Sequence, residues 1–278
     1  MILIVDSGST KTEWIAVENG QIVGQTKTLG INPVYQSFEE IQKDITENVA
    51  PYFKGYTFVE VHYYGAGCIP EKIEGMKEVL AKVFTSSTKT TVQSDLIGAA
   101  LALCGNTSGI ACILGTGANT CFWDGEKVAK NVPALGFILG DEGSGAVLGR
   151  TFIADVLKNQ ISERIASKFL SETGLTAGDI INKVYRQPFP NRFLATFTRF
   201  MNENRHEKEI EAIIVRCFTQ FFERNIKQYD YKNYPVNIIG SIGFYFKEML
   251  EMAATPMGIK LGIVEQSPVM GLVKYHSK

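Results

Sequence analysis

The chain has 278 residues, of which 45% are hydrophobic and 21% are charged, and its formal net charge is −1. This length suits one large domain or two domains of roughly 130 residues each. A net charge near zero gives no broad attraction to nucleic acid or to an anionic membrane, so neither is expected as a partner. No apolar run reaches the roughly 18 residues that a membrane helix needs.

The five cysteines and the start of the chain indicate a cellular compartment. The cysteines form no CxxC pair and no close cluster with histidine. Their odd number in a chain of this length argues against a disulfide framework and fits a reducing environment. The apolar stretch before Asp6 is too short for the core of a signal peptide. We therefore expect a soluble cytoplasmic protein.

Two segments of the sequence are similar to each other. Residues 2–14 read ILIVDSGSTKTEW and residues 111–123 read ACILGTGANTCFW. With Trp14 aligned on Trp123, each has an apolar run, a polar turn with glycine and a second strand-like run. An Asn-Gly or Asp-Gly pair typical of tight hairpins follows each copy, and then a third strand that ends in Leu-Gly. Two such meanders predict a duplicated domain; a chance likeness between unrelated meanders is the alternative.

The rest of the chain alternates between strand and helix patterns. Apolar spacing predicts helices at 37–49, 73–84, 96–103, 145–159, 162–172 and 207–229, and strands at 58–64, 90–93 and 236–239. This alternation predicts an α/β protein with a mixed sheet and helical cover in each half. We expect an N-terminal domain at 1–107 and a C-terminal domain at 108–278. The sequence leaves open whether the last helix packs back on the N-terminal domain.

The first candidate site is the turn of the first repeat, DSGSTKT. Small residues between two strands can direct several backbone N–H groups to one place, as in a phosphate cradle. The candidate phosphate-binding residues are Gly8, Ser9, Thr10, Lys11 and Thr12. Asp6, at the end of an apolar strand, could hold Mg²⁺ through water. An ordinary polar hairpin turn is the alternative, and the segment is not a Walker A motif.

The second turn, from Gly115 to Thr120, is the equivalent segment of the second repeat. Its candidate phosphate-binding residues are Gly115, Thr116, Gly117 and Asn119. Two such turns that face each other across a cleft could bind a polyphosphate from both sides. A third candidate, Gly240-Ser241, follows the predicted strand at 236–239 and could form a flat floor for adenine. A tight strand-to-helix turn is the alternative for this segment.

Carboxylates mark two further positions. Asp95 lies where a strand ends and a helix begins, so it is either an N-cap or a general base that deprotonates an acceptor hydroxyl. Ser94 could serve as the cap instead. Asp141 and Glu142 lie between glycines just before a helix, where carboxylates can bind sugar hydroxyls. A capping segment, with Asp141 or Ser144 as the cap, is the alternative there.

Several other polar residues give weak signals. Asn32 is a lone polar residue in a loop, and without context it is read as a turn former. The three histidines are scattered along the sequence and suggest no metal site.

Together these motifs resemble the BadF/BadG/BcrA/BcrD-type ATPases and, within them, the N-acetylglucosamine kinases. That family belongs to the superfamily of acetate kinase, sugar kinases, Hsp70 and actin. The resemblance runs from Asp6 to about Gly243, in the expected order. It rests on DSGSTKT (6–12), SDLIGAA (94–100), LGTGAN (114–119), LGDEGSG (139–145) and IIGSIG (238–243). Of these, LGDEGSG is the most specific, because generic actin-like ATPases lack it.

The resemblance implies a fold and a set of roles. The fold would be two duplicated ribonuclease H-like, or actin-like ATPase, domains with an interdomain cleft. Asp95 matches the base that activates the sugar hydroxyl, and Asp6 matches the carboxylate near Mg²⁺. Residues 8–12 match the loop for the β- and γ-phosphates. The matching sugar or phosphate contacts are Asn32, Gly117, Ala118, Asn119 and Asp141.

The sequence departs from the family at two places. Ser7 and Ser9 stand where members often have glycine, and Phe137 stands where a Gly-Trp-Gly segment usually places a tryptophan on the sugar. N-acetylglucosamine, N-acetylmuramic acid and glucosamine all remain open as substrates. The sequence also leaves open whether the chain forms a homodimer.

We therefore expect an ATP- and Mg²⁺-dependent kinase that phosphorylates an N-acetylated amino sugar. One alternative is an ATPase that activates a 2-hydroxyacyl-CoA dehydratase, which would hold an iron–sulfur cluster. Another alternative is a non-enzymatic, sugar-sensing regulator on a kinase-derived fold.

Overall fold

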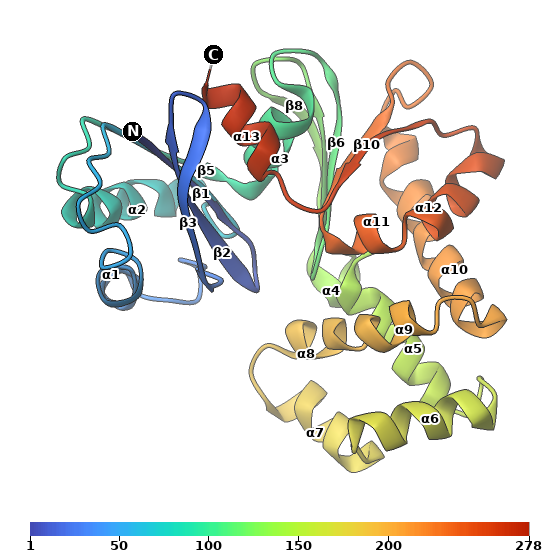
Figure 1. Ribbon diagram of the computed structural model, residues 1–278. Helices are drawn as coiled ribbons and strands as arrows, with labels where there is room; N and C mark the ends of the chain where they lie inside the picture. Colours follow the sequence, from blue (N-terminus) through green and yellow to red (C-terminus); the bar gives the residue numbers. More distant parts are fainter. Residues whose placement is uncertain (278) are drawn as a thin grey trace. The chain divides into compact units, whose positions relative to one another are not determined.

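The computed structural model describes residues 1–277, which form two compact units (Figure 1). The first unit contains residues 1–108, 123–129 and the segment that begins at Ser267. The second unit contains residues 109–122 and 130–266. We propose that these units correspond to the two expected domains, with the C-terminal segment belonging to the first.

The first unit is built on a mixed five-stranded sheet in the order β3-β2-β1-β4-β5. β1 is antiparallel to β2 and parallel to β4, and β5 continues the parallel half. The strands are β1 Ile2–Ser7, β2 Lys11–Glu18, β3 Gln21–Leu29, β4 Glu60–Gly65 and β5 Lys89–Ser94. The helices are α1 Phe38–Asn48, α2 Pro70–Val83, α3 Asp95–Cys104 and α13 Val269–His276.

Successive side chains of β4 face opposite sides of this sheet. Tyr63 lies in the core under α1 and α2, where its ring contacts Trp14 edge-on with the centroids 6.4 Å apart. Tyr64 faces α3 and α13 on the other side, and Gly98 of α3 lies directly against it. α13 also packs closely on α3, because a Cβ atom at Gly271 would lie 2.4 Å from the Ala102 carbonyl oxygen.

The second unit has a five-stranded sheet in the order β10-β9-β6-β7-β8. Its strands are β6 Gly109–Leu114, β7 Ala118–Trp123, β8 Val128–Val132, β9 Val236–Ile239 and β10 Leu261–Glu265. Its α-helices are α4 Gly136–Leu139, α5 Gly145–Leu157, α6 Glu163–Thr173, α7 Ala177–Arg186, α8 Pro190–Thr196, α9 Thr198–Glu203, α10 Lys208–Arg224, α11 Ser241–Tyr245 and α12 Lys247–Ala254. Two 3-10 helices, η1 Ile226–Gln228 and η2 Thr255–Met257, follow α10 and α12.

The two sheets have the same topology. From the outer strand of the meander, the first reads β3-β2-β1-β4-β5 and the second reads β8-β7-β6-β9-β10. The two aligned tryptophans are buried in equivalent strands, Trp14 in β2 and Trp123 in β7. The expected fold of two duplicated actin-like α/β domains is confirmed.

Local sequence signals fix several helix ends. Ser37 and Glu40 form a capping box at the start of α1, with Ser37 N–H donating to Glu40 Oε2 at 2.8 Å. One boundary differs from the prediction: the helix expected at 207–229 ends at Arg224, and η1 follows. Within residues 1–277, no helix has the length and apolar character needed to cross a membrane.

Candidate active site

Three strands of the first unit end at the same edge of the sheet. Asp6 of β1 lies beside Tyr64 of β4 in the parallel register, and Ser7 lies beside Gly65. Gly65 in turn lies beside Ser94, the last residue of β5. The carboxyl ends of parallel strands are the usual binding edge of an open α/β sheet. This register therefore brings the phosphate turn, Asp6 and Asp95 to one edge of the first unit.

The turn between β1 and β2 is held by its own backbone. Gly8 N–H donates to the Lys11 carbonyl oxygen at 2.9 Å, and Gly30 N–H donates to the Thr10 carbonyl oxygen at 3.0 Å. Gly30 has to be glycine here, because a Cβ atom would lie 2.5 Å from the Gly8 carbonyl oxygen. Gly30, the residue after β3, thus packs directly against the backbone of the turn.

The side chain of Thr12 differs from the predicted phosphate contacts, because its hydroxyl is not at the surface of the turn. Its side chain is fully buried, and its hydroxyl lies 2.7 Å from Ser7 Oγ and donates to the Leu29 carbonyl oxygen. Ile31 N–H donates to the Ser7 hydroxyl at 3.2 Å. Thr12 therefore anchors the base of the turn, and its hydroxyl is out of reach of a ligand.

Asp95 is the first residue of α3, but it is not the cap. Ser94 is the N-cap, and its hydroxyl accepts a hydrogen bond from Ile97 N–H. The Asp95 carboxylate accepts one from Leu96 N–H at 2.9 Å. Burial raises the pKa of Asp95 to about 6, although this backbone hydrogen bond opposes the shift. The structure thus decides between the two capping candidates in favour of Ser94.

Asp6 has an even higher pKa than Asp95. Burial, and then the nearby charges of Asp95 and Glu13, raise the pKa of Asp6 to about 7, while Lys11 lowers it. Two carboxylates that repel each other at a binding edge are a feature of functional sites. A cation placed there would relieve this repulsion.

Asn32 lies at the same edge of the first unit. Its side-chain oxygen accepts a hydrogen bond from Val34 N–H at 3.0 Å, as expected of a turn former. The same oxygen would lie 2.1 Å from a Cβ atom at Gly67, which has a positive φ of +76°. The loop after β4 therefore packs closely against Asn32 and holds its side chain in place. The local sequence around Asn32 gives no sign of this contact with Gly67.

In the second unit, the turn from Gly115 to Gly117 is fixed from two sides. The carbonyl oxygens of Gly115 and Thr116 accept hydrogen bonds from Gly145 and Ala146 N–H, at the start of α5. Gly240 packs so closely on the end of β6 that a Cβ atom there would lie 2.2 Å from the Leu114 carbonyl oxygen. The turn from Gly115 to Gly117 and the segment at Gly240 therefore pack against each other within this unit. Ser241, which follows Gly240, is exposed.

Asp141 faces this turn. It has a left-handed backbone, with φ at 53°, and Ala118 N–H donates to its carboxylate. A Cβ atom at Gly117 would lie 3.1 Å from its Oδ2 atom. Burial raises the pKa of Asp141 to about 6, with a smaller contribution from Glu142. Ser144 caps α5 through Val147 N–H, so Asp141 is not needed as the helix cap.

Glu142 lies in a different environment from Asp141. Its two carboxylate oxygens accept hydrogen bonds from Arg224 Nε and from Asn225 Nδ2, at the end of α10. Only 14% of its side chain is exposed. Glu142 therefore fixes the loop that carries Asp141, and its contact with a sugar stays a prediction.

The other predicted residues of this unit occupy the same region of the fold. Asn119 follows the glycine turn, and its side-chain oxygen accepts a hydrogen bond from Asn131 Nδ2 at 3.0 Å. Phe137 packs on the core of the unit, and its carbonyl oxygen accepts a hydrogen bond from Arg150. The neighbouring apolar side chains of Leu135, Ile138 and Leu139 are exposed.

Models of protein families and curated proteins give no match to this sequence. Among solved structures, a Porphyromonas gingivalis protein named "Putative N-acetylglucosamine Kinase" is 44% identical to the chain. The match covers 100% of this chain and 99% of that protein, with a TM-score of 0.98. The chain belongs to the N-acetylglucosamine kinase-like family. The family and the enzyme class expected from the sequence, a sugar kinase, are confirmed.

Two more distant structures share the fold of this kinase. A Chromobacterium violaceum protein, also named "Putative N-acetylglucosamine Kinase", is 14% identical, with a TM-score of 0.76 and 99% of each chain covered. A ROK family glucokinase from Streptomyces griseus, solved in complex with glucose and AMPPNP, is 17% identical, with a TM-score of 0.60. That match covers 99% of this chain and 97% of the glucokinase.

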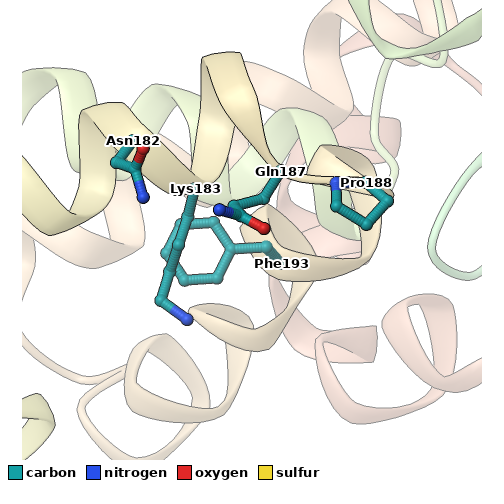
Figure 2. Close-up of a pocket in the computed structure, with 5 residues that line it drawn as sticks. All are labelled: Asn182, Lys183, Gln187, Pro188 and Phe193. Carbon is teal, nitrogen blue, oxygen red and sulfur yellow. The ribbon is translucent and has the colours of Figure 1, made fainter.

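The kinase also has a surface hollow away from these residues. It lies between α7 and α8 and has a volume of about 270 Å³ (Figure 2). Its lining residues are Asn182, Lys183, Gln187, Pro188 and Phe193. Lys183 Nζ lies 5.3 Å from the centroid of the Phe193 ring, and this cation–π contact joins two of the lining side chains. The hollow contains none of the predicted site residues.

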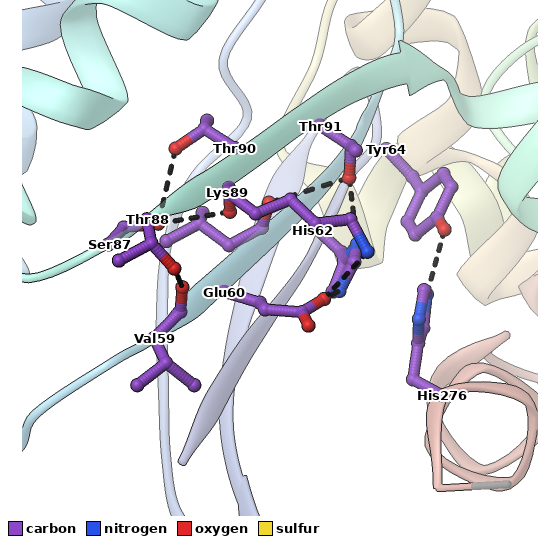
Figure 3. Close-up of polar contacts among 11 residues, drawn as sticks. Val59, Glu60, His62, Tyr64, Ser87, Thr88, Lys89, Thr90, Thr91 and His276 are labelled. Atoms are coloured by element: carbon purple, nitrogen blue, oxygen red, sulfur yellow. Dashed lines mark hydrogen bonds and ion pairs between the residues drawn. The ribbon is translucent and has the colours of Figure 1, made fainter.

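Two of the three histidines meet in the first unit, although they are far apart in the sequence. The rings of His62 on β4 and His276 on α13 stack with their centroids 3.9 Å apart (Figure 3). His276 Nε2 is hydrogen-bonded to the Tyr64 hydroxyl at 2.8 Å, and His62 Nε2 lies 2.9 Å from Glu60. Among residues 1–277, no group of three potential ligand side chains could hold a metal.

This histidine pair predicts a pH-dependent contribution to stability. Burial, and then the His62 charge, lower the pKa of His276 to about 4, and burial lowers the pKa of His62. The histidines have higher pKa values in the unfolded chain than in the folded protein, so the unfolded chain takes up protons at a higher pH. The stabilising contribution of the pair is therefore complete above about pH 6.5 and is lost as the pH falls toward 4.

The change that tests this contribution is His276→Phe, which keeps a stacked ring but does not titrate. Relative to the wild type, we expect the variant to gain about 1–2 kcal/mol of unfolding free energy between pH 6.5 and pH 4. Urea unfolding of both proteins across this range measures the difference. A difference that does not change with pH would contradict the assignment.

Proposed function

We propose that this enzyme transfers the γ-phosphate of ATP to a hydroxyl group of an N-acetylated amino sugar. The observation that carries the proposal is the placement of Asp95 beside Asp6 at the binding edge of the first unit, with the capping role already taken by Ser94. Membership in the N-acetylglucosamine kinase-like family supports the choice of sugar.

Each unit provides candidate ATP-binding residues in this proposal. The turn from Gly8 to Lys11 provides backbone N–H groups and one positive charge for the β- and γ-phosphates. The turn from Gly115 to Gly117, together with Asn119, provides the second phosphate contact. Gly240 and Ser241 contact the adenosine in this proposal, since Ser241 is exposed and the backbone of Gly240 packs closely on the end of β6.

In the transfer step, the Asp95 carboxylate accepts the proton of the sugar hydroxyl. The hydroxyl oxygen forms a bond to the γ-phosphorus, and the bond from that phosphorus to the bridging oxygen breaks, which leaves ADP. A carboxylate with a pKa of about 6 is largely ionised at neutral pH and is matched to this role. Positioning and charge neutralisation provide most of the catalysis in phosphoryl transfer.

The carboxylates of the first unit fit a Mg²⁺ ion that is held mainly by water and phosphate oxygens. Asp6 is a partly buried carboxylate whose pKa is raised first by burial and then by the nearby negative charges of Asp95 and Glu13. Mg²⁺ in kinases usually takes one or two carboxylates and completes its shell with water and substrate phosphates. When bound, it would neutralise charge on the β- and γ-phosphates.

The sugar contacts in this proposal come from Asn32 and Asp95 in the first unit and from Ala118, Phe137 and Asp141 in the second. Asp141 is suited to accept hydrogen bonds from sugar hydroxyls, because Ala118 N–H and the Glu142–Arg224 pair hold its loop. Phe137 would contact an apolar face or the acyl group of the sugar.

The direct test is an ADP-release assay with ATP, Mg²⁺ and a panel of sugars. We expect N-acetylglucosamine or N-acetylmuramic acid to give the highest kcat/KM and glucose to give a much lower value. ADP release that no sugar in the panel accelerates would overturn the proposal. Iron and colour in the purified protein would favour the dehydratase-activator alternative instead.

A further inference from the structure

The lysine of the phosphate turn is already paired with a buried carboxylate. Lys11 Nζ lies 2.9 Å from Glu13 Oε1, and the two residues lie on the same face of β2. Glu13 is only 7% exposed, whereas 53% of the Lys11 side chain is exposed. Because a buried carboxylate is costly without a partner, Lys11 can leave Glu13 at low cost only if another partner remains there.

A second lysine binds the same oxygen atom of Glu13. Lys27 Nζ lies 2.9 Å from Glu13 Oε1, and Ser267 Oγ donates to Oε2 at 3.0 Å. Although burial acts to raise it, the hydrogen bonds from Lys27 and Lys11 keep the pKa of Glu13 below its ordinary value. Glu13 therefore keeps two partners if Lys11 leaves.

The sheet register places these groups directly across neighbouring strands. Asp6 of β1 is opposite Glu13 of β2, and Glu13 is opposite Lys27 of β3. Residues opposite each other in such a row have Cβ atoms about 5 Å apart. Lys27 therefore lies within reach of Glu13 whether or not Lys11 is paired.

We propose that Lys27 is a positioning residue that keeps Glu13 paired when Lys11 leaves it, so that Lys11 can turn to the polyphosphate of ATP. The inference rests on the proposed function, in which Lys11 binds phosphate. Without Lys27, Lys11 is the only cation on Glu13 among residues 1–277, and its departure leaves the buried carboxylate with the Ser267 hydroxyl as its partner there. ATP binding then has to compete with the Lys11–Glu13 pair.

The test is Lys27→Met, with direct ATP binding measured by calorimetry and with kcat and KM from the kinase assay. We expect the Kd and KM for ATP to rise about tenfold, a cost typical of losing one charge-assisted hydrogen bond to a buried carboxylate. We expect kcat and the KM for the sugar to change less than twofold. Lys27→Arg should restore ATP binding, because it keeps the charge on Glu13.

The matched control is Lys89→Met. Lys89 also pairs with a glutamate, Glu60, at 3.0 Å across strands, and its side chain is 59% exposed, as is that of Lys27. We expect this control to leave ATP binding unchanged. Equal effects of Lys27→Met and Lys89→Met would overturn the proposal.

A double mutant separates this exchange from a simple loss of positive charge near ATP. In a Lys11→Met background, Lys27→Met should have no further effect on the Kd for ATP, because no Lys11 remains to be released. A further tenfold loss in that background would show that Lys27 acts directly on the nucleotide and would contradict the inference. Calorimetry with ATP needs no sugar acceptor, so an error in the proposed sugar would not hide either result.

Discussion

Asp95→Asn should lower kcat by at least about 100-fold while ATP still binds, because the variant keeps the shape of the side chain but cannot accept a proton. Ser94 caps α3, and the Asp95 carboxylate accepts hydrogen bonds from the backbone N–H groups of Leu96 and of Asp95 itself, which an asparagine oxygen can also accept. The fold should therefore remain intact. The measurement is steady-state kinetics with the preferred amino sugar, together with calorimetry for ATP.

The control for this variant is Ser94→Ala, which removes the neighbouring helix cap and leaves the carboxylate. We expect it to lose about 1 kcal/mol of unfolding free energy and to keep most of its turnover. If Asp95→Asn kept near-normal turnover, or if Ser94→Ala lost turnover equally, Asp95 would not be the base.

Gly240→Ala should lower the unfolding free energy by at least about 3 kcal/mol and abolish ATP binding. Gly240 has φ at +127° and ψ at 155°, a region that is essentially limited to glycine and costs other residues about 1–3 kcal/mol. The added Cβ atom would also lie 2.2 Å from the Leu114 carbonyl oxygen, so backbone would have to move. That movement would displace the adjoining phosphate turn. Urea unfolding and ATP calorimetry measure the two effects.

Gly258→Ala is the matched control in the same unit. Gly258 also has a positive φ, +66°, but no atom lies within 4 Å of an added Cβ. The left-handed conformation alone should cost about 1–2 kcal/mol, and ATP binding should be unaffected. If the two variants lost similar amounts of unfolding free energy, the contact with β6 would not be the reason why position 240 requires glycine.

The duplicated fold could be predicted from the sequence because its signals are local. Apolar strands, Gly-containing turns and helical spacing each fall within about ten residues, and the repeat showed which strands are equivalent. The segment from Gly174 to His206 was not assigned, although it contains three helices, α7 to α9. Its helices are short, Phe189 between α7 and α8 has a left-handed backbone, and Pro190 starts α8, so no long apolar period is visible.

The sequence indicates candidate site residues, but it does not indicate the residues that they contact. Glu142 is adjacent to Asp141 in the sequence and looked equivalent to it, yet its carboxylate is bound by Arg224, more than 80 residues away. Asn225, the residue after α10, donates to the other oxygen of Glu142. The local sequence likewise does not reveal that the Thr12 hydroxyl is buried against Ser7.

The contact between the two histidines could not be predicted from the sequence either. His62 and His276 have no sequence relation, and only the packing of α13 on the first unit brings their rings together. Glu13 and Lys27 were also not identified, because their pairing depends on the register between β2 and β3.

The identity of the phosphorylated product tests the central claim most directly. The kinase would be incubated with ATP, Mg²⁺ and N-acetylglucosamine, and the reaction followed by phosphorus NMR. The account predicts a new phosphomonoester signal of the sugar that grows in step with ADP and is absent with Asp95→Asn. Inorganic phosphate as the only other product, formed at the same rate with and without the sugar, would contradict it.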